Sequence, residues 1–98
     1  MINRKDLLSR PNYLHTRWQN EIYNQLVIYK NTTGLTENGL ALAFGKSERY
    51  IKKILNGNAN MTIKDLIEFG IVIGKVPIIE FVNPDEYWER QEQKIKIA

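Results

Sequence analysis

Four cationic side chains gather within eight residues near the middle of the chain. They are Lys46, Arg49, Lys52 and Lys53. Glu48 is the one acidic residue among them, so residues 46–53 carry a net charge of +3. An arginine fork can bond the O6 and N7 atoms of guanine together, whereas a lysine offers a point charge that suits phosphate. The cluster therefore indicates a polyanionic partner, with Arg49 as first candidate for reading a base and Lys52 and Lys53 for contacts to phosphates or bases.

Polar residues on either side of the cluster could contact the same partner. Asn56 and Asn58 could bond phosphates through their amides, Thr36 could help a helix N-terminus meet a phosphate, and Lys46 could reach the backbone. Each feature also has a structural interpretation. Glu48 could accept from a cytosine amine or only favour a helix N-terminus, the asparagines could only form a turn, and the basic set could be a solvated helix face. Both interpretations stay open at this point.

Residues 35–57 predict two short helices joined by a tight turn, which would position the cluster. Thr36 is a cap residue for a helix over 37–44, and Ser47 is one for a helix over 48–55. Gly45 between them can adopt the positive φ that a tight helix exit needs. Asn56 and Gly57 then end the second helix with residue types that tolerate a left-handed conformation.

Apolar residues in the same stretch can hold the two helices at a fixed angle. They are Leu40, Phe44, Ile51, Ile54 and Leu55, with the small Ala41 where the helices cross closely. With these residues directed inward, Glu48, Arg49, Lys52 and Lys53 lie on the opposite side of the second helix, and Tyr50 lies at the boundary.

A long amphipathic helix is predicted over 12–32, ahead of the two short helices. Its apolar stripe is Leu14, Trp18, Ile22, Leu26 and Tyr29, widened by Tyr23 and Val27. Residues at steps of three and four share one face of a helix, so this stripe packs on the rest of the domain. We expect Tyr13 and Trp18 to belong to the core.

A further helix is predicted over 62–74, capped by Thr62 and closed by Gly74. Its apolar residues predict a mostly buried helix and are Ile63, Leu66, Ile67, Phe69, Val72 and Ile73. The run 76–82 is rich in β-branched residues and has two readings, an edge strand, which we favour, or a short helix that begins at Pro77.

The pattern resembles the Cro/repressor class of helix-turn-helix proteins, the xenobiotic response element family. The matching places are Leu35-Thr36, Leu40-Ala41, Gly45, Ser47, Ile51 and Asn56-Gly57, followed by the run 61–66. The resemblance covers roughly residues 20–75. Glu37, Gly39 and Lys46 depart from the family's pattern.

The resemblance implies an all-α, lambda-repressor-like domain of about five helices over residues 1–82, with an acidic aromatic extension at 83–98. It implies a sequence-specific transcriptional regulator, a repressor that binds operator DNA as a homodimer with helix 47–55 in the major groove. The candidate DNA-binding residues are Thr36, Lys46, Ser47, Glu48, Arg49, Tyr50, Lys52, Lys53, Asn56 and Asn58. The alternatives are an antitoxin that binds a toxin and its own promoter, or a protein-interaction module on this scaffold without DNA binding.

Composition narrows the remaining classes of function and location. The chain of 98 residues has no cysteine and one histidine, His15, so no thiolate metal site and no Ser-His-Asp or Cys-His catalytic set is indicated. We therefore expect no enzyme, no metal and no cofactor. No apolar run is long enough for a transmembrane helix, and the N-terminal residues lack a signal-peptide pattern, so we expect a cytoplasmic protein without a membrane partner.

Overall fold

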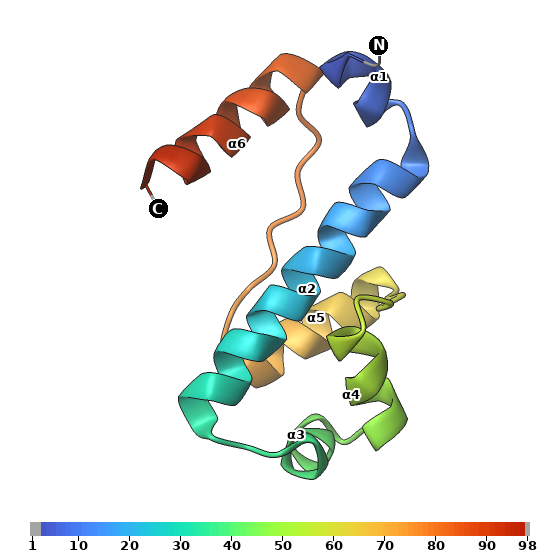
Figure 1. Cartoon of the computed structure of the whole chain (residues 1–98), viewed down its shortest axis with the longest axis vertical. Helices are drawn as coiled ribbons and strands as arrows, with labels where there is room; N and C mark the ends of the chain where they lie inside the picture. Colours follow the sequence, from blue (N-terminus) through green and yellow to red (C-terminus); the bar gives the residue numbers. More distant parts are fainter. Residues whose placement is uncertain (1–2, 98) are drawn as a thin grey trace. The chain divides into compact units, whose positions relative to one another are not determined.

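The computed structural model describes residues 3–97, and the side chains of residues 3–93. The chain is mostly helical, as expected for an all-α protein. The helices found in the described part are α1 (Arg4–Leu8), α2 (Pro11–Thr33), α3 (Glu37–Phe44), α4 (Glu48–Leu55), α5 (Ile63–Ile73) and α6 (Pro84–Ile97) (Figure 1). Contacts divide the chain into two compact units, one made of residues 3–14 and 78–97 and the other of residues 15–77.

Side-chain caps fix where α3, α4 and α5 begin, as predicted from the sequence. The hydroxyl of Thr36 accepts the Gly39 N–H at 3.1 Å, and the hydroxyl of Ser47 accepts the Tyr50 N–H at 3.2 Å. Thr62 and Asp65 form a reciprocal capping box, with distances of 3.1 and 3.2 Å. Each cap satisfies first-turn N–H groups that have no partner within the helix.

The turn between α3 and α4 follows the predicted geometry. Gly45 has a φ of 63°, and its N–H donates to the carbonyl of Leu42 at 3.1 Å. The next residue, Lys46, donates its N–H to the carbonyl of Ala41 at 3.0 Å. These bonds satisfy the last carbonyls of α3 and reverse the chain within three residues, so α4 begins directly after the turn.

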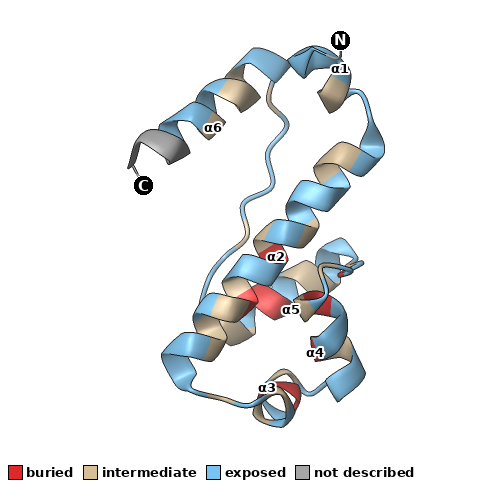
Figure 2. Ribbon diagram, in the orientation of Figure 1, coloured by how far each residue is buried: buried red, intermediate tan, exposed pale blue. Residues whose placement is uncertain are grey.

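The core of the unit formed by residues 15–77 lies where α2, α3, α4 and α5 meet (Figure 2). Its buried residues are Ile22, Leu26, Leu40, Ala41, Ile51, Ile54, Ala59 and Phe69. The ring of Phe44 packs against this cluster and stacks on Phe69 with centroids 5.3 Å apart. Tyr29 from α2 meets the same ring edge-on at 6.0 Å, so aromatic contacts join α2, α3 and α5.

Two predictions about burial were wrong in detail. Trp18 is 41% exposed, although its step-of-four spacing predicted a core residue. Each step of four turns about 40° around a helix of 3.6 residues per turn, so Trp18 lies about 80° from the fully buried Leu26. In α5 the isoleucines at 63 and 67 are exposed, because only the side that carries Phe69 faces the other helices.

The prediction of an edge strand at 76–82 was also wrong. Residues 75–83 form neither a strand nor a helix, so the alternative helix at Pro77 is absent as well. β-Branched residues favour a strand only when a neighbouring strand supplies the hydrogen-bond ladder, and no described segment does so. This stretch instead connects α5 to α6.

The unit formed by residues 3–14 and 78–97 is organised around Trp88 of α6. Its ring packs against Tyr87 and Tyr13, with centroids 5.1 and 6.2 Å away, and the Arg4 guanidinium lies 5.1 Å from its centre. Arg4 also pairs with Glu92 at 3.2 Å. Aromatic packing is the main contribution here, because exposed ion pairs add little in water.

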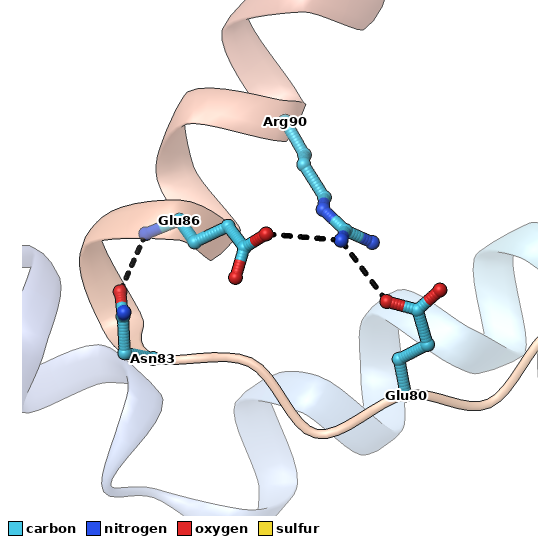
Figure 3. Close-up of polar contacts among 4 residues, drawn as sticks. All are labelled: Glu80, Asn83, Glu86 and Arg90. Carbon is cyan, nitrogen blue, oxygen red and sulfur yellow. Dashed lines mark hydrogen bonds and ion pairs between the residues drawn. The ribbon is translucent and has the colours of Figure 1, made fainter.

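A second polar network fixes the beginning of α6 (Figure 3). Asn83 accepts the Glu86 N–H at 2.8 Å and so caps the helix. The guanidinium of Arg90 donates to Glu80 and Glu86, each at 3.0 Å, and these bonds raise the pKa of Arg90. The acidic residues of this segment are thus partly neutralised within their own unit.

Alanine substitutions at two glycines should change the stability of the fold in opposite directions. A Cβ at Gly70 would lie 2.6 Å from the Lys75 carbonyl oxygen and 2.9 Å from Pro77. Gly70→Ala should therefore destabilise the chain by about 1–3 kcal/mol, since backbone must move. At Gly39 the nearest atom is the flexible end of Leu35 at 3.1 Å, so Gly39→Ala should stabilise it by up to ~1 kcal/mol. Urea unfolding measures both, and equal effects would contradict the packing described.

Candidate nucleic-acid interface

Helix α4 has one face in the core and the other in solvent. Ile51 and Ile54 are 0% and 1% exposed and hold the inner face against α2, α3 and α5. The exposed residues are Glu48, Arg49, Lys52 and Lys53. At about 100° per residue these four side chains cover a continuous arc of about 140°. The cationic cluster therefore lies on one side of a helix whose other side is anchored.

None of the cations in this cluster forms an ion pair with another described residue. Glu48 and Lys52 are one turn apart, a spacing that permits a pair, yet no pair forms between them. Lys30 and Lys64 also form no ion pair with a described residue, so this property does not single out α4. What distinguishes α4 is that several unpaired cations share one exposed face, where their potentials add.

Lys46 joins this face from the turn before α4. Its ammonium lies 5.7 Å from the centre of the Tyr50 ring, within the range of a cation–π contact. The Tyr50 ring in turn lies 6.3 Å from Phe44 and is half-buried. Tyr50 was predicted as a binding residue at the boundary, and the structure places its ring where it supports Lys46 and joins α4 to the core.

Burial of the Tyr50 side chain raises the pKa of its phenol, and the carboxylates of Asp65 and Glu68 raise it further. The phenol therefore stays neutral at ordinary pH and adds no negative charge beside the cations. A hollow of about 220 Å³ opens next to it, lined in part by Lys46, Lys53 and Asp65. Asp65 also takes part in the α5 capping box but keeps its charge, so two ammonium groups and one carboxylate line this hollow.

The loop after α4 carries the predicted asparagines on its surface. The N–H groups of Asn56 and Asn58 donate to the carbonyls of Lys52 and Lys53, each at 2.9 Å, so these backbone donors are already occupied. Their side chains are exposed. Hydrogen bonds that these two asparagines donate to a partner would therefore come from their side-chain amides.

Sequence reasoning missed Gln19, which anchors this loop from α2. Its side-chain amide donates to the carbonyl of Ala59 at 2.9 Å, and Ala59 is itself buried. The available signal was positional, because Gln19 precedes Ile22 by three and Leu26 by seven residues and so falls on the inward face. A polar residue on that face needs a partner, and the loop carbonyl supplies one.

Thr36 lies at the start of α3, in the same unit as α4. Its hydroxyl is exposed but is used to accept the Gly39 N–H, which leaves the backbone N–H groups of Glu37 and Asn38 at the helix end. Such groups can bind an anionic oxygen. The Glu37 carboxylate lies in this first turn and opposes that use by its charge.

All ten predicted site residues thus belong to the unit of residues 15–77, at the N-cap of α3, in the turn, in α4 and in the loop that follows. No group of His, Cys, Asp and Glu that could hold a metal ion is found among the described side chains. No helix in the described part of the chain combines the length and apolar character that crossing a membrane requires.

Comparisons of the chain with protein-family models, with curated proteins and with solved structures found no match.

The Tyr50 phenol predicts how stability depends on alkaline pH. Its folded pKa is raised above the unfolded value of about 10, so above that pH the folded chain holds a proton that the unfolded chain has lost. This stabilising contribution is complete below about pH 10 and is lost as the pH rises through the folded pKa. Tyr50→Phe should therefore show a shallower loss of stability from pH 9 to about pH 11 in urea unfolding.

Tyr23→Phe is the matched control, because Tyr23 is an exposed tyrosine of the same unit. It should follow the parent's alkaline decline. A Tyr50→Phe profile parallel to that of the parent would contradict the assignment.

Proposed function

We propose that this chain is a sequence-specific transcriptional regulator that binds double-stranded operator DNA with α4 in the major groove. The observation that carries the proposal is the exposed cationic face of α4, whose opposite face is held by the buried Ile51 and Ile54. A helix is about 10–12 Å across with its side chains, and the major groove is about 12 Å wide. An anchored helix of this kind can present side chains to base edges.

The residues of this face divide by chemistry into two roles. Arg49, near the N-terminus of α4, is the candidate for bidentate bonds to guanine, which discriminate by about 1–3 kcal/mol against a wrong base. Lys52 and Lys53, with Lys46 on the turn, are candidates for phosphate contacts, which fix the register of a protein on the duplex. Thr36 and Ser47 contribute by fixing the two helix N-termini.

The order of elements supports the family resemblance drawn from the sequence. A long helix precedes two short helices joined by a tight turn, and a capped helix follows. In the proposal, two copies bind half-sites about 34 Å apart, one turn of the duplex. A dimer bound at a promoter would act as a cytoplasmic repressor by excluding polymerase.

Selection from a pool of random duplex DNA at two salt concentrations tests the proposal. The parent should enrich a symmetric motif, and the Arg49→Ala, Lys52→Ala double variant should lose it or relax it. The slope of log affinity against log salt is negative, and each phosphate contact that is lost should make it less steep by about 0.9.

The matched control is the double variant Arg10→Ala, Lys30→Ala, which removes the same charge from exposed or half-exposed sites outside α4. It should select the parent's motif. Motif-free binding that disappears with salt, or equal loss in both double variants, would contradict base reading by α4 and would favour a protein-interaction module.

A further inference from the structure

The outward side of α5 carries a row of exposed isoleucines. Ile63, Ile67 and Ile71 are 66%, 45% and 72% exposed, although they are large apolar side chains. They follow one another at steps of four and so form a single ridge along the helix. The capping box at Thr62 and the left-handed Gly74 fix both ends of α5, so the ridge is rigid.

We propose that this ridge is the surface through which two copies of the chain pair, with the α5 helices antiparallel across a two-fold axis at Ile67. The proposal deepens the proposed function, because it names the dimer face, but pairing can be measured without DNA. A two-fold interface must be complementary to itself. Ile67 lies midway between the other two isoleucines, so Ile63 meets Ile71 of the second copy and Ile67 meets its own counterpart.

Charges beside the ridge match the same arrangement. Lys64 and Glu68 lie on one flank of the isoleucines, and neither forms an ion pair with another described residue. At 1.5 Å of rise per residue, an antiparallel pair centred on Ile67 places Lys64 within about 3 Å in height of Glu68 of the second copy. The two-fold keeps both on the same flank. Two Lys64–Glu68 pairs therefore border the apolar contact, and they outnumber the one like-charge pair, Glu68 with Glu68 of the second copy, which is also about 3 Å apart in height.

The size of the ridge predicts a weak dimer. A contact made by one helix from each copy is smaller than the 1,200–2,000 Å² typical of stable interfaces. We therefore expect the free chain to dimerise only at high concentration. Adjacent half-sites on DNA would hold two copies together and strengthen the pairing through effective concentration.

Cysteine cross-linking of the full chain tests the geometry directly, because the chain has no cysteine of its own. Under mild oxidation Ile67→Cys should form a covalent dimer, since facing positions of packed helices fall within disulfide range. Ile28→Cys, an exposed isoleucine on α2, is the matched control and should stay monomeric. Equal cross-linking of both variants would overturn the proposal.

Charge reversal tests the same pairing without touching the apolar contact. In sedimentation equilibrium, Lys64→Glu and Glu68→Lys should each weaken dimerisation several-fold, and the double reversal should restore it. A parent that stays monomeric near 1 mM, or a double reversal without recovery, would overturn the proposal. The proposal would also be overturned if Ile78→Glu dissociated the dimer and Ile67→Glu left it intact. That result would place the contact in residues 75–83.

Binding to a duplex with a single half-site separates this proposal from the proposed function. The Ile67→Glu variant should bind a single half-site with the parent's affinity. It should not show the parent's gain in affinity when the duplex carries a second half-site. A chain that pairs through Ile67 but binds no DNA would contradict the proposed function alone.

Discussion

The packing of the Phe44 ring among α2, α3, α4 and α5 is the contact on which the arrangement of the cationic face depends. The ring stacks on Phe69 and meets Tyr29 and Tyr50, so one side chain touches residues from three other helices. Phe44 is also the last residue of α3, immediately before the turn. Its packing therefore ties the turn, and the start of α4 just after it, to the core.

The dependence is strong because α4 is only eight residues long. Isolated helices shorter than about 12–15 residues are marginal in water, so α4 exists through its contacts and its cap. Ile51 and Ile54 supply the contacts, and Ser47 supplies the cap. No ion pair with another described residue occupies the exposed face of α4, so the cations there are available to a polyanion.

Local signals in the sequence predicted the local structure well. The caps at Thr36, Ser47 and Thr62 and the left-handed turn at Gly45 follow from the chemistry of one residue and its near neighbours. The alternation of apolar and charged residues in α4 likewise predicted which side chains would be buried. These features need no knowledge of distant contacts.

Features set by distant contacts were not predicted. The step-of-four stripe of α2 did not show that Trp18 would lie beyond the reach of the other helices, and the apolar content of α5 did not show that one side would remain uncovered. The β-branched run at 76–82 lacks a neighbouring strand, which sequence pattern cannot reveal. Within the site, the support of the loop by Gln19 depends on residues 40 positions apart in the sequence meeting in space.

Mapping of backbone amide shifts by NMR during titration with duplex DNA tests the central claim most directly. We expect the largest changes on α4 and the turn before it, at Lys46, Arg49, Lys52 and Lys53, with smaller changes at Thr36 and Asn56. Changes confined to α1 and α6, or no changes at moderate salt, would contradict the claim that α4 is the DNA-binding surface.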